Sequence, residues 1–254
     1  MLLEVKDLNI SLTSEKSVAE HISFRLGQGE MLSIVGSSGA GKTTICKAIM
    51  GLLGNAYRAD GEILFQGEDL LDLPERKRQT IYGKEICLIM QNPMTAFNPS
   101  IRVGRQMEKT YLLHHGKTPR QEMQRLFAAI LQKLGLEDTQ RILNSYPFTL
   151  SGGMLQRLMI AAALMCQPAL LVADEATTAI DACNRIGLMR ELKSFCKDGM
   201  SVLFVTHDLR SASVSDRILV MDRGQIVEQG KTEQILNTPK EDYTKYLLNA
   251  CRLE

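Results

Sequence analysis

Short apolar runs alternate with segments of helical periodicity along most of the chain. The runs are typical of strands buried on both faces of a sheet. Four of them are found, at Met31–Val35, Ile86–Met90, Leu170–Ala173 and Ser201–Thr206. Ile218–Met221 and Gln225–Glu228 predict a late hairpin about Asp222-Arg223-Gly224. Helical spacing of apolar residues predicts helices over 43–53, 155–165 and 186–195. Strands that alternate with helices in this way indicate an α/β fold with a mainly parallel sheet.

Other segments depart from this alternation. Leu2–Ile10 and His21–Leu26 alternate apolar and polar positions, which predicts a small antiparallel β layer at the N-terminus. Helical periodicity from Val103 to about Gln140 predicts a helical insert, and the charged run Leu73–Gln79 is interpreted as a solvated loop. We therefore expect one domain, with a core at 1–91 and 158–230, a helical subdomain at 92–157 and a short helical tail at 231–254.

Composition narrows the class of protein. The net charge is +1, so no global electrostatic field favours the binding of nucleic acid, and no nucleic-acid partner is expected. The chain is 44% hydrophobic and 23% charged, which suits a globular domain with a real core. No apolar stretch reaches the roughly 20 residues that a bilayer requires, and the start of the chain has no secretion signal. The six cysteines are scattered, which is typical of reduced thiols.

One glycine-rich segment carries the strongest chemical signal. The sequence GSSGAGKT over 36–43 matches GxxxxGK[ST] in full, between a predicted buried strand and a predicted helix. Glycines allow backbone N–H groups to converge on phosphate oxygens, and the helix start adds its positive dipole end. Lys42 can reach the β- and γ-phosphates, and the Thr43 hydroxyl can bind Mg²⁺. The candidate ATP-binding residues are Gly36, Ser37, Ser38, Gly39, Ala40, Gly41, Lys42, Thr43 and Thr44.

An acidic pair supplies the second half of a nucleotide site. Asp174 and Glu175 follow the apolar strand Leu170–Ala173, at the edge where open α/β sheets bind ligands. Asp174 is predicted to organise the shell of a magnesium ion. Glu175 is predicted to polarise the attacking water as general base. An ordinary acidic pair after a strand is the alternative, and the neighbouring phosphate loop makes it the weaker one.

Three further features are candidate parts of the site because of where they lie relative to predicted strands and helices. His207 and Gln91 each follow a predicted strand, at the same edge as the acidic pair. His207 could sense the γ-phosphate and hold Glu175 or the water, although a lone histidine is more often structural. Ser151 is a candidate N-cap before a long helix, and Gly152 and Gly153 leave backbone N–H groups open to an anion. A simple capped helix start is the alternative there.

Together these elements resemble the ATP-binding-cassette (ABC) ATPases, in the same order along the chain. The resemblance implies a P-loop NTPase (RecA-like) core with an N-terminal antiparallel β layer and an inserted helical subdomain. It implies ATP with Mg²⁺, the metal being held by Thr43, Gln91 and Asp174, and Glu175, His207 and Gln91 as catalytic residues. Ala179-Ile180-Asp181 is similar to the family's D-loop. In this family two cassettes pair head to tail, so the signature residues would act in trans: Ser151, Gly152, Gly153 and Met154.

A finer resemblance concerns the importers of oligopeptides, dipeptides and nickel. It rests on QNPMTAFNP at 91–99, YPF at 146–148 before the signature, and TPKEDYTKYLL at 238–248. Met154 and the short C-terminus are most similar to the nickel-import ATP-binding subunits. The implied partners are a paralogous ATPase subunit in a heterodimer, two membrane permease subunits and an extracytoplasmic solute-binding protein. The implied location is peripheral, on the cytoplasmic face of the inner membrane.

Alternatives remain at the level of function. Peptide import fits the same site chemistry, because a binding protein and permeases choose the cargo. A soluble ABC ATPase of translation or DNA repair usually holds two cassettes or a coiled-coil insert, which this chain lacks. A small-molecule P-loop kinase would leave the signature and His207 unexplained. The chain also departs from the family at Ser11–Glu20, which holds no aromatic residue to stack on adenine, so Val18 is expected to pack there.

Overall fold

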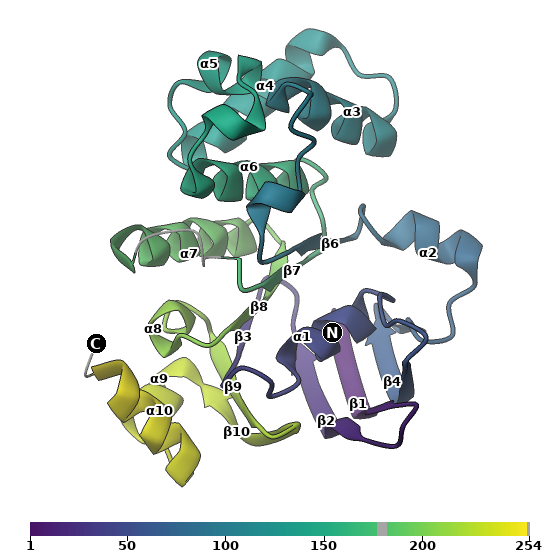
Figure 1. The fold of residues 1–254 in the computed structure, drawn as a ribbon, viewed down its shortest axis with the longest axis vertical. Helices are drawn as coiled ribbons and strands as arrows, with labels where there is room; N and C mark the ends of the chain where they lie inside the picture. Colours follow the sequence, from purple (N-terminus) through teal and green to yellow (C-terminus); the bar gives the residue numbers. More distant parts are fainter. Residues whose placement is uncertain (177–181, 253–254) are drawn as a thin grey trace.

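The computed structural model describes the backbone of residues 1–176 and 182–252, and the side chains of 1–176 and 185–251. Two sheets form its framework (Figure 1). The first has the strand order β2-β1-β4-β5 and the second the order β10-β9-β3-β8-β7-β6. The predicted α/β architecture with an N-terminal antiparallel layer is confirmed.

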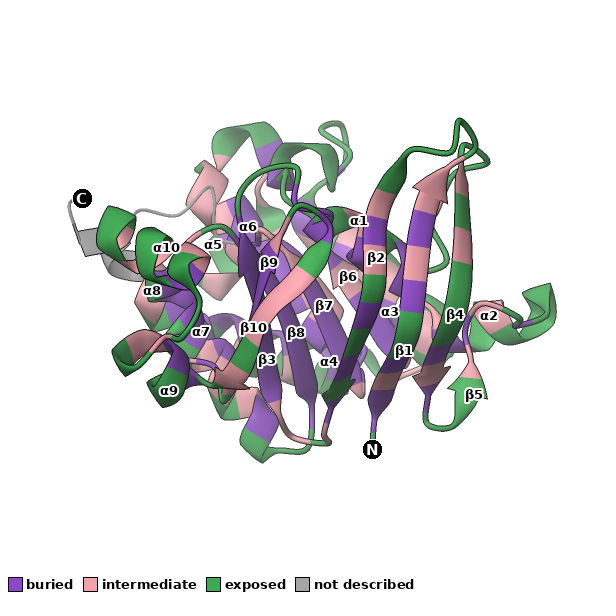
Figure 2. Cartoon of the chain, turned by 90° about the horizontal axis from the view of Figure 1, so that it is seen from below, coloured by how far each residue is buried: buried purple, intermediate pink, exposed green. Residues whose placement is uncertain are grey.

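The six-stranded sheet carries the predicted buried strands. Its strands are β3 (Met31–Gly36), β6 (Ile86–Ile89), β7 (Leu170–Asp174), β8 (Ser201–Thr206), β9 (Arg217–Asp222) and β10 (Gln225–Lys231). All pairings are parallel except that of β9 with β10. Figure 2 shows β3, β8 and β7 buried along almost their whole length. Burial on both faces explains why these segments are continuously apolar.

The N-terminal sheet is antiparallel and flanks the first helix. It contains β1 (Leu3–Leu12), β2 (Ser17–Leu26), β4 (Tyr57–Phe65) and β5 (Glu68–Asp69). β1 and β2 alternate between buried and exposed residues, as expected for a sheet with one face on the core (Figure 2). Helix α1 (Lys42–Ile49) packs on this side, and its buried Ile45 and Ile49 join the apolar core beneath the sheet.

A helical part rises from the β6 end of the core (Figure 1). It contains η1 (Pro93–Thr95), α3 (Val103–His115), α4 (Arg120–Lys133), α5 (Thr139–Asn144), η2 (Pro147–Thr149) and α6 (Gly152–Leu164). The helical periodicity predicted over 103–140 is divided between α3 and α4, because Gly116 has a positive φ and Pro119 caps α4. Helix α6 crosses the boundary expected at 157/158, and its buried Leu158 and Leu164 belong to the same apolar cluster as α3 and α4.

The segment predicted as a charged loop at Leu73–Gln79 is a helix instead. Residues Glu75–Ile81 form α2, which begins after Pro74. Within α2 only Ile81 is buried, so the segment lacks the apolar stripe on which a helix prediction depends. The loop prediction was therefore wrong for a physical reason: this helix turns nearly all of its surface to solvent.

The remaining helices follow β7 in the chain. They are α7 (Ala182–Lys197), α8 (Leu209–Ala212), α9 (Thr232–Asn237) and α10 (Asp242–Arg252). In Figure 1, α8, α9 and α10 lie together beside β9 and β10. Among the residues that the structure describes, no helix has both the length and the apolar character to cross a membrane.

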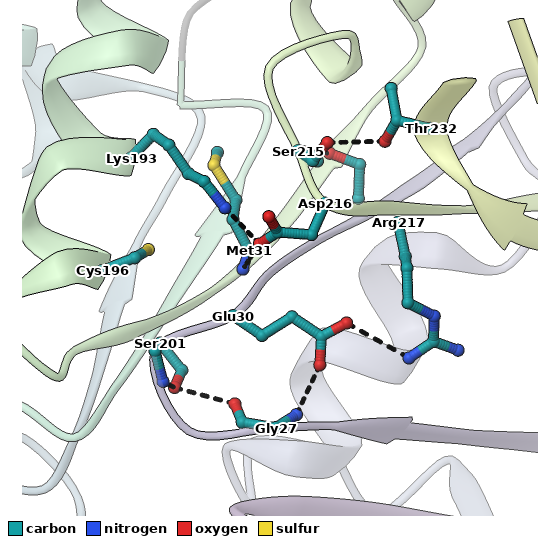
Figure 3. Close-up of polar contacts among 12 residues, drawn as sticks. Gly27, Glu30, Met31, Lys193, Cys196, Ser201, Ser215, Asp216, Arg217 and Thr232 are labelled. Carbon is teal, nitrogen blue, oxygen red and sulfur yellow. Dashed lines mark hydrogen bonds and ion pairs between the residues drawn. The ribbon is translucent and has the colours of Figure 1, made fainter.

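A polar network fixes the start of the parallel strands (Figure 3). One carboxylate oxygen of Asp216 accepts a 2.8 Å hydrogen bond from the backbone N–H of Met31 and also binds the ammonium group of Lys193 on α7. The Ser201 hydroxyl donates to the carbonyl of Gly27 at 3.0 Å. The first two contacts join α7 to the beginnings of β3 and β9, and the third joins the beginning of β8 to the residue that follows Leu26. The opposite ends of the parallel strands carry the candidate site residues.

Candidate active site

The glycine-rich loop joins the end of β3 to the start of α1. Gly41 is the N-cap residue of α1 and has a φ of 94°, a left-handed conformation that glycine adopts without steric cost. A Cβ atom at Gly36 would lie 2.2 Å from the carbonyl oxygen of Met221, so only glycine fits this close approach to β9. Ser37, Ser38 and Gly39 are exposed at the tip. The loop therefore presents backbone N–H groups at a helix start, which is where anions bind.

Lys42 is held beneath this loop. It is only 4% exposed, and its Nζ donates to the carbonyl oxygens of Gly36 and Ser37, both at 2.8 Å. Burial lowers the pKa of Lys42, while the charges of Glu175 and Asp174 oppose that shift. The ammonium group is thus fixed by two carbonyls beside a pair of carboxylates, and an anionic ligand would add to the stabilisation of its charge.

Asp174 and Thr43 meet at the end of β7. The Thr43 hydroxyl donates to Asp174 Oδ1 at 3.1 Å, which joins the start of α1 to the acidic strand end. Burial raises the pKa of Asp174, and the hydrogen bond from Thr43 opposes the shift. Hydroxyl, carboxylate and amide oxygens are the hard ligands that Mg²⁺ prefers. Thr43 and Asp174, which meet at one point, therefore supply oxygen ligands that suit a magnesium ion.

Glu175 lies at the centre of three strand ends. Its Oε2 accepts a 2.6 Å hydrogen bond from Nε2 of Gln91, which follows β6, and its Oε1 lies 3.3 Å from Nδ1 of His207, which follows β8. Its backbone N–H donates to the carbonyl of Val205 at 2.8 Å. The φ of Glu175 is 48°, an uncommon value for a residue other than glycine. The fold thus places the Glu175 carboxylate between an amide and an imidazole, which fix the orientation of its two oxygens.

The predicted signature residues lie in another part of the molecule. Ser151 is the N-cap of α6, and its hydroxyl accepts from the backbone N–H of Met154 at 3.3 Å. Gly152 begins the helix, so the predicted capped start is confirmed. In Figure 1, α6 belongs to the helical part, apart from α1 and its loop. Within one chain, therefore, the fold gathers Lys42, Asp174 and Glu175 but leaves Ser151 on a separate surface.

Ala179-Ile180-Asp181, which is similar to a D-loop, lies outside the residues that the structure describes. Sequence reasoning also missed Tyr243, whose hydroxyl accepts a 3.1 Å hydrogen bond from the backbone N–H of Ser37. The segment around Tyr243 was noted only for its resemblance to a family tail. No local signal in the sequence links it to the loop more than 200 residues earlier.

Comparison with known proteins supports the same chemistry. A family profile described as ABC transporter matches residues 19–178. The chain is 41% identical over 251 residues to the metal-staphylopine import system ATP-binding protein CntD of Staphylococcus aureus, covering 98% of this chain and 92% of that protein. It is 41% identical over 254 residues to the oligopeptide transport ATP-binding protein OppD of Bacillus subtilis, covering 97% and 71%.

Among solved structures, the fold matches a dimeric ATP-binding cassette in a post-hydrolysis state bound to ADP and Pi. The TM-score is 0.80 at 26% identity, and the match covers 91% of this chain and 99% of the other. The structure thus agrees with the sequence relatives in indicating a nucleotide-hydrolysing cassette.

Proposed function

The chain belongs to the ABC transporter family, and we propose that it drives the uptake of nickel, free or chelated, across the cytoplasmic membrane. It is an ATP-binding subunit of the type found in importers of oligopeptides and of metal-staphylopine, and its activity is ATP hydrolysis coupled to transport. The observation that favours a metal cargo is the 41% identity, over nearly the whole of both chains, to an import protein whose name specifies metal-staphylopine.

Peptide import is the second candidate. It is favoured by the equal identity, 41%, to an oligopeptide transport protein, although this chain covers 71% of that protein rather than 92%. The catalytic chemistry is the same in both cases. The two candidates therefore differ only in which solute-binding protein and permeases the subunit serves.

The proposed reaction begins with ATP in the loop between β3 and α1. Backbone N–H groups of the loop and the Lys42 ammonium group bind the phosphates. Glu175 accepts a proton from the attacking water, while Gln91 at 2.6 Å and His207 at 3.3 Å hold its two carboxylate oxygens. Bound Mg²⁺, held by Thr43, Gln91 and Asp174, would neutralise phosphate charge. Fixed charges aimed at the transferred phosphoryl group supply most of the rate gain.

The second half of each site is proposed to come from another cassette. Ser151 and the glycines after it lie on α6, away from the loop of their own chain (Figure 1). A head-to-tail pair would bring the exposed start of this helix to the partner's nucleotide, where Ser151, Gly152, Gly153 and Met154 would act in trans. ATP binding then closes the pair and hydrolysis reopens it.

We further propose that the helical segment 92–157 transmits this motion to two membrane permease subunits. Met94 on η1 and Phe148 on η2 are 58% and 67% exposed, which suits a contact with an apolar partner. The side-chain amide of Gln91 contacts Glu175, and η1 begins two residues after Gln91. A movement of this amide would therefore reach the exposed surface through one short helix. An extracytoplasmic solute-binding protein would deliver the cargo, with this subunit peripheral on the cytoplasmic face.

Uptake of labelled nickel by cells lacking only this gene tests the proposed cargo. We expect nickel uptake to be lost while labelled dipeptide uptake continues. The intact chain should restore uptake, and Lys42→Ala should not, since nickel transport would require ATP use by this subunit. Loss of dipeptide uptake with nickel uptake intact would move the protein to peptide import and leave every catalytic assignment unchanged.

A heterodimer with a paralogous ATPase is the proposed working pair. The resemblance to the importers of oligopeptides, dipeptides and nickel implies two different ATPase subunits in one transporter. We therefore expect a purified transporter to contain one copy of this chain and one of the paralogue, as intact-complex mass spectrometry would measure. Full transport by a complex with two copies of this chain and no other ATPase would contradict the proposal.

A further inference from the structure

The C-terminal helix α10 is tied to the elements that bear the nucleotide site. Its residues Tyr243 and Leu247 pack against an apolar cluster that includes Val35, the penultimate residue of β3, and Leu209 of α8. Helix α8 begins two residues after His207. One face of α10 therefore covers both the strand that leads into the phosphate-binding loop and the helix that follows the candidate histidine.

Polar contacts fix α10 at both ends. The two carboxylate oxygens of Glu228, on β10, accept from the backbone N–H groups of Lys240 and Glu241 at 2.8 and 3.2 Å, just before the helix. At the other end, the Arg210 guanidinium group donates to the carbonyl of Cys251. Because α10 is held at both ends and along one face, the position of Tyr243 is set by the surrounding fold.

The Tyr243 hydroxyl reaches the phosphate-binding loop itself. It accepts a 3.1 Å hydrogen bond from the N–H of Ser37. The carbonyl of the same peptide unit, that of Gly36, accepts from Lys42 Nζ at 2.8 Å. In a trans peptide the N–H and the C=O point in opposite directions, and the chain has no cis peptide bonds in its described part. Tyr243 and Lys42 thus hold the two sides of one peptide plane.

We propose that Tyr243 is a positioning residue for Lys42, acting through the Gly36–Ser37 peptide. Rotation of the plane would break the bond to Tyr243, so the Gly36 carbonyl is kept directed at the ammonium group. The lysine is then ordered before nucleotide arrives, so binding costs less conformational entropy. This inference rests on the proposed role of Lys42 at the phosphates, and it gives the C-terminal helix a part in ATP binding.

A single-atom change tests the proposal. Tyr243→Phe removes the hydroxyl and keeps the ring that packs on the cluster. Tyr246→Phe is the matched control, because Tyr246 lies on the same helix and is 68% exposed. Binding of the non-hydrolysable analogue AMP-PNP with Mg²⁺ would be measured on the full chain, by competition against a fluorescent ATP analogue. Hydrogen exchange of the Ser37 amide and thermal unfolding would be measured on the same samples.

For Tyr243→Phe we expect Kd for AMP-PNP to rise about fivefold, the net value of one hydrogen bond, and the Ser37 amide to exchange about tenfold faster. Tyr246→Phe should change neither. Faster exchange with unchanged affinity would show that the contact exists but does not position Lys42, and equal losses in both variants would also overturn the proposal. If Lys42→Ala itself binds AMP-PNP normally, the proposed site fails; if only Tyr243→Phe does, this inference alone fails.

Discussion

Glu175→Gln is expected to lower steady-state ATP hydrolysis by at least about 10²-fold, the usual contribution of a general base, while ATP still binds. Glutamine has nearly the shape of glutamate, and its carbonyl can still accept the 2.6 Å hydrogen bond that Gln91 donates. The neutral amide cannot take a proton from water. The substitution therefore removes the proton acceptor and retains the hydrogen bond with Gln91.

The same variant should accumulate a closed pair of cassettes, because the step that reopens the pair is blocked. Size-exclusion chromatography with ATP and Mg²⁺ would show this as a shift towards the dimer. Glu137→Gln is a suitable control, since Glu137 is exposed before α5 in the helical part and the amide substitution is the same. Undiminished hydrolysis by the assembled Glu175→Gln transporter would contradict the role of Glu175 as base.

Lys42→Ala is expected to raise Kd for ATP by about 100-fold or more, given that charge-assisted hydrogen bonds to phosphate are each worth roughly 1.5–3 kcal/mol. Lys42 is almost fully buried and its ammonium group lies against the carbonyls of Gly36 and Ser37. Alanine leaves neither a charge nor a donor there. Competition against a fluorescent ATP analogue would measure the loss on the full chain.

Lys197→Ala provides the control, because Lys197 is exposed at the end of α7 and no hydrogen bond joins it to the loop in the described structure. It should bind ATP with nearly wild-type affinity. Thermal unfolding of both variants separates a local effect from a loss of fold. Normal ATP affinity in folded Lys42→Ala would refute the assignment of this lysine to the phosphates.

The sequence predicted the strands whose residues are all buried, because every position in such a strand favours an apolar residue. β3 and β8 are buried on both faces, so their residues are apolar throughout and are recognised as runs. In β4, which begins at Tyr57, only the second half carries an apolar pattern, at Ile63, Leu64 and Phe65. Its first residues, 57–62, are exposed or half-buried and carry no apolar alternation. The same cause made α2 unrecognisable.

The candidate site was predicted for a different reason. Its residues follow strands of one parallel sheet, and the carboxyl ends of such strands meet at one edge. Gln91, Glu175 and His207 could therefore be grouped from strand ends alone, and the structure joins them by hydrogen bonds. Their individual partners could not be predicted, because side-chain contacts depend on strand order and on rotamers that no local pattern encodes.

The sequence by itself determined the phosphate-binding loop, because glycine, lysine and threonine at fixed spacing act through backbone geometry that is local to eight residues. Only the tertiary structure decided what surrounds that loop. Tyr243 meets Ser37 because α10 folds back over β3 and α8, held by Glu228 and Arg210. Contacts of this kind arise from packing between distant segments. The apolar pattern of a segment shows that one of its faces is buried, but it does not show which other segment covers that face.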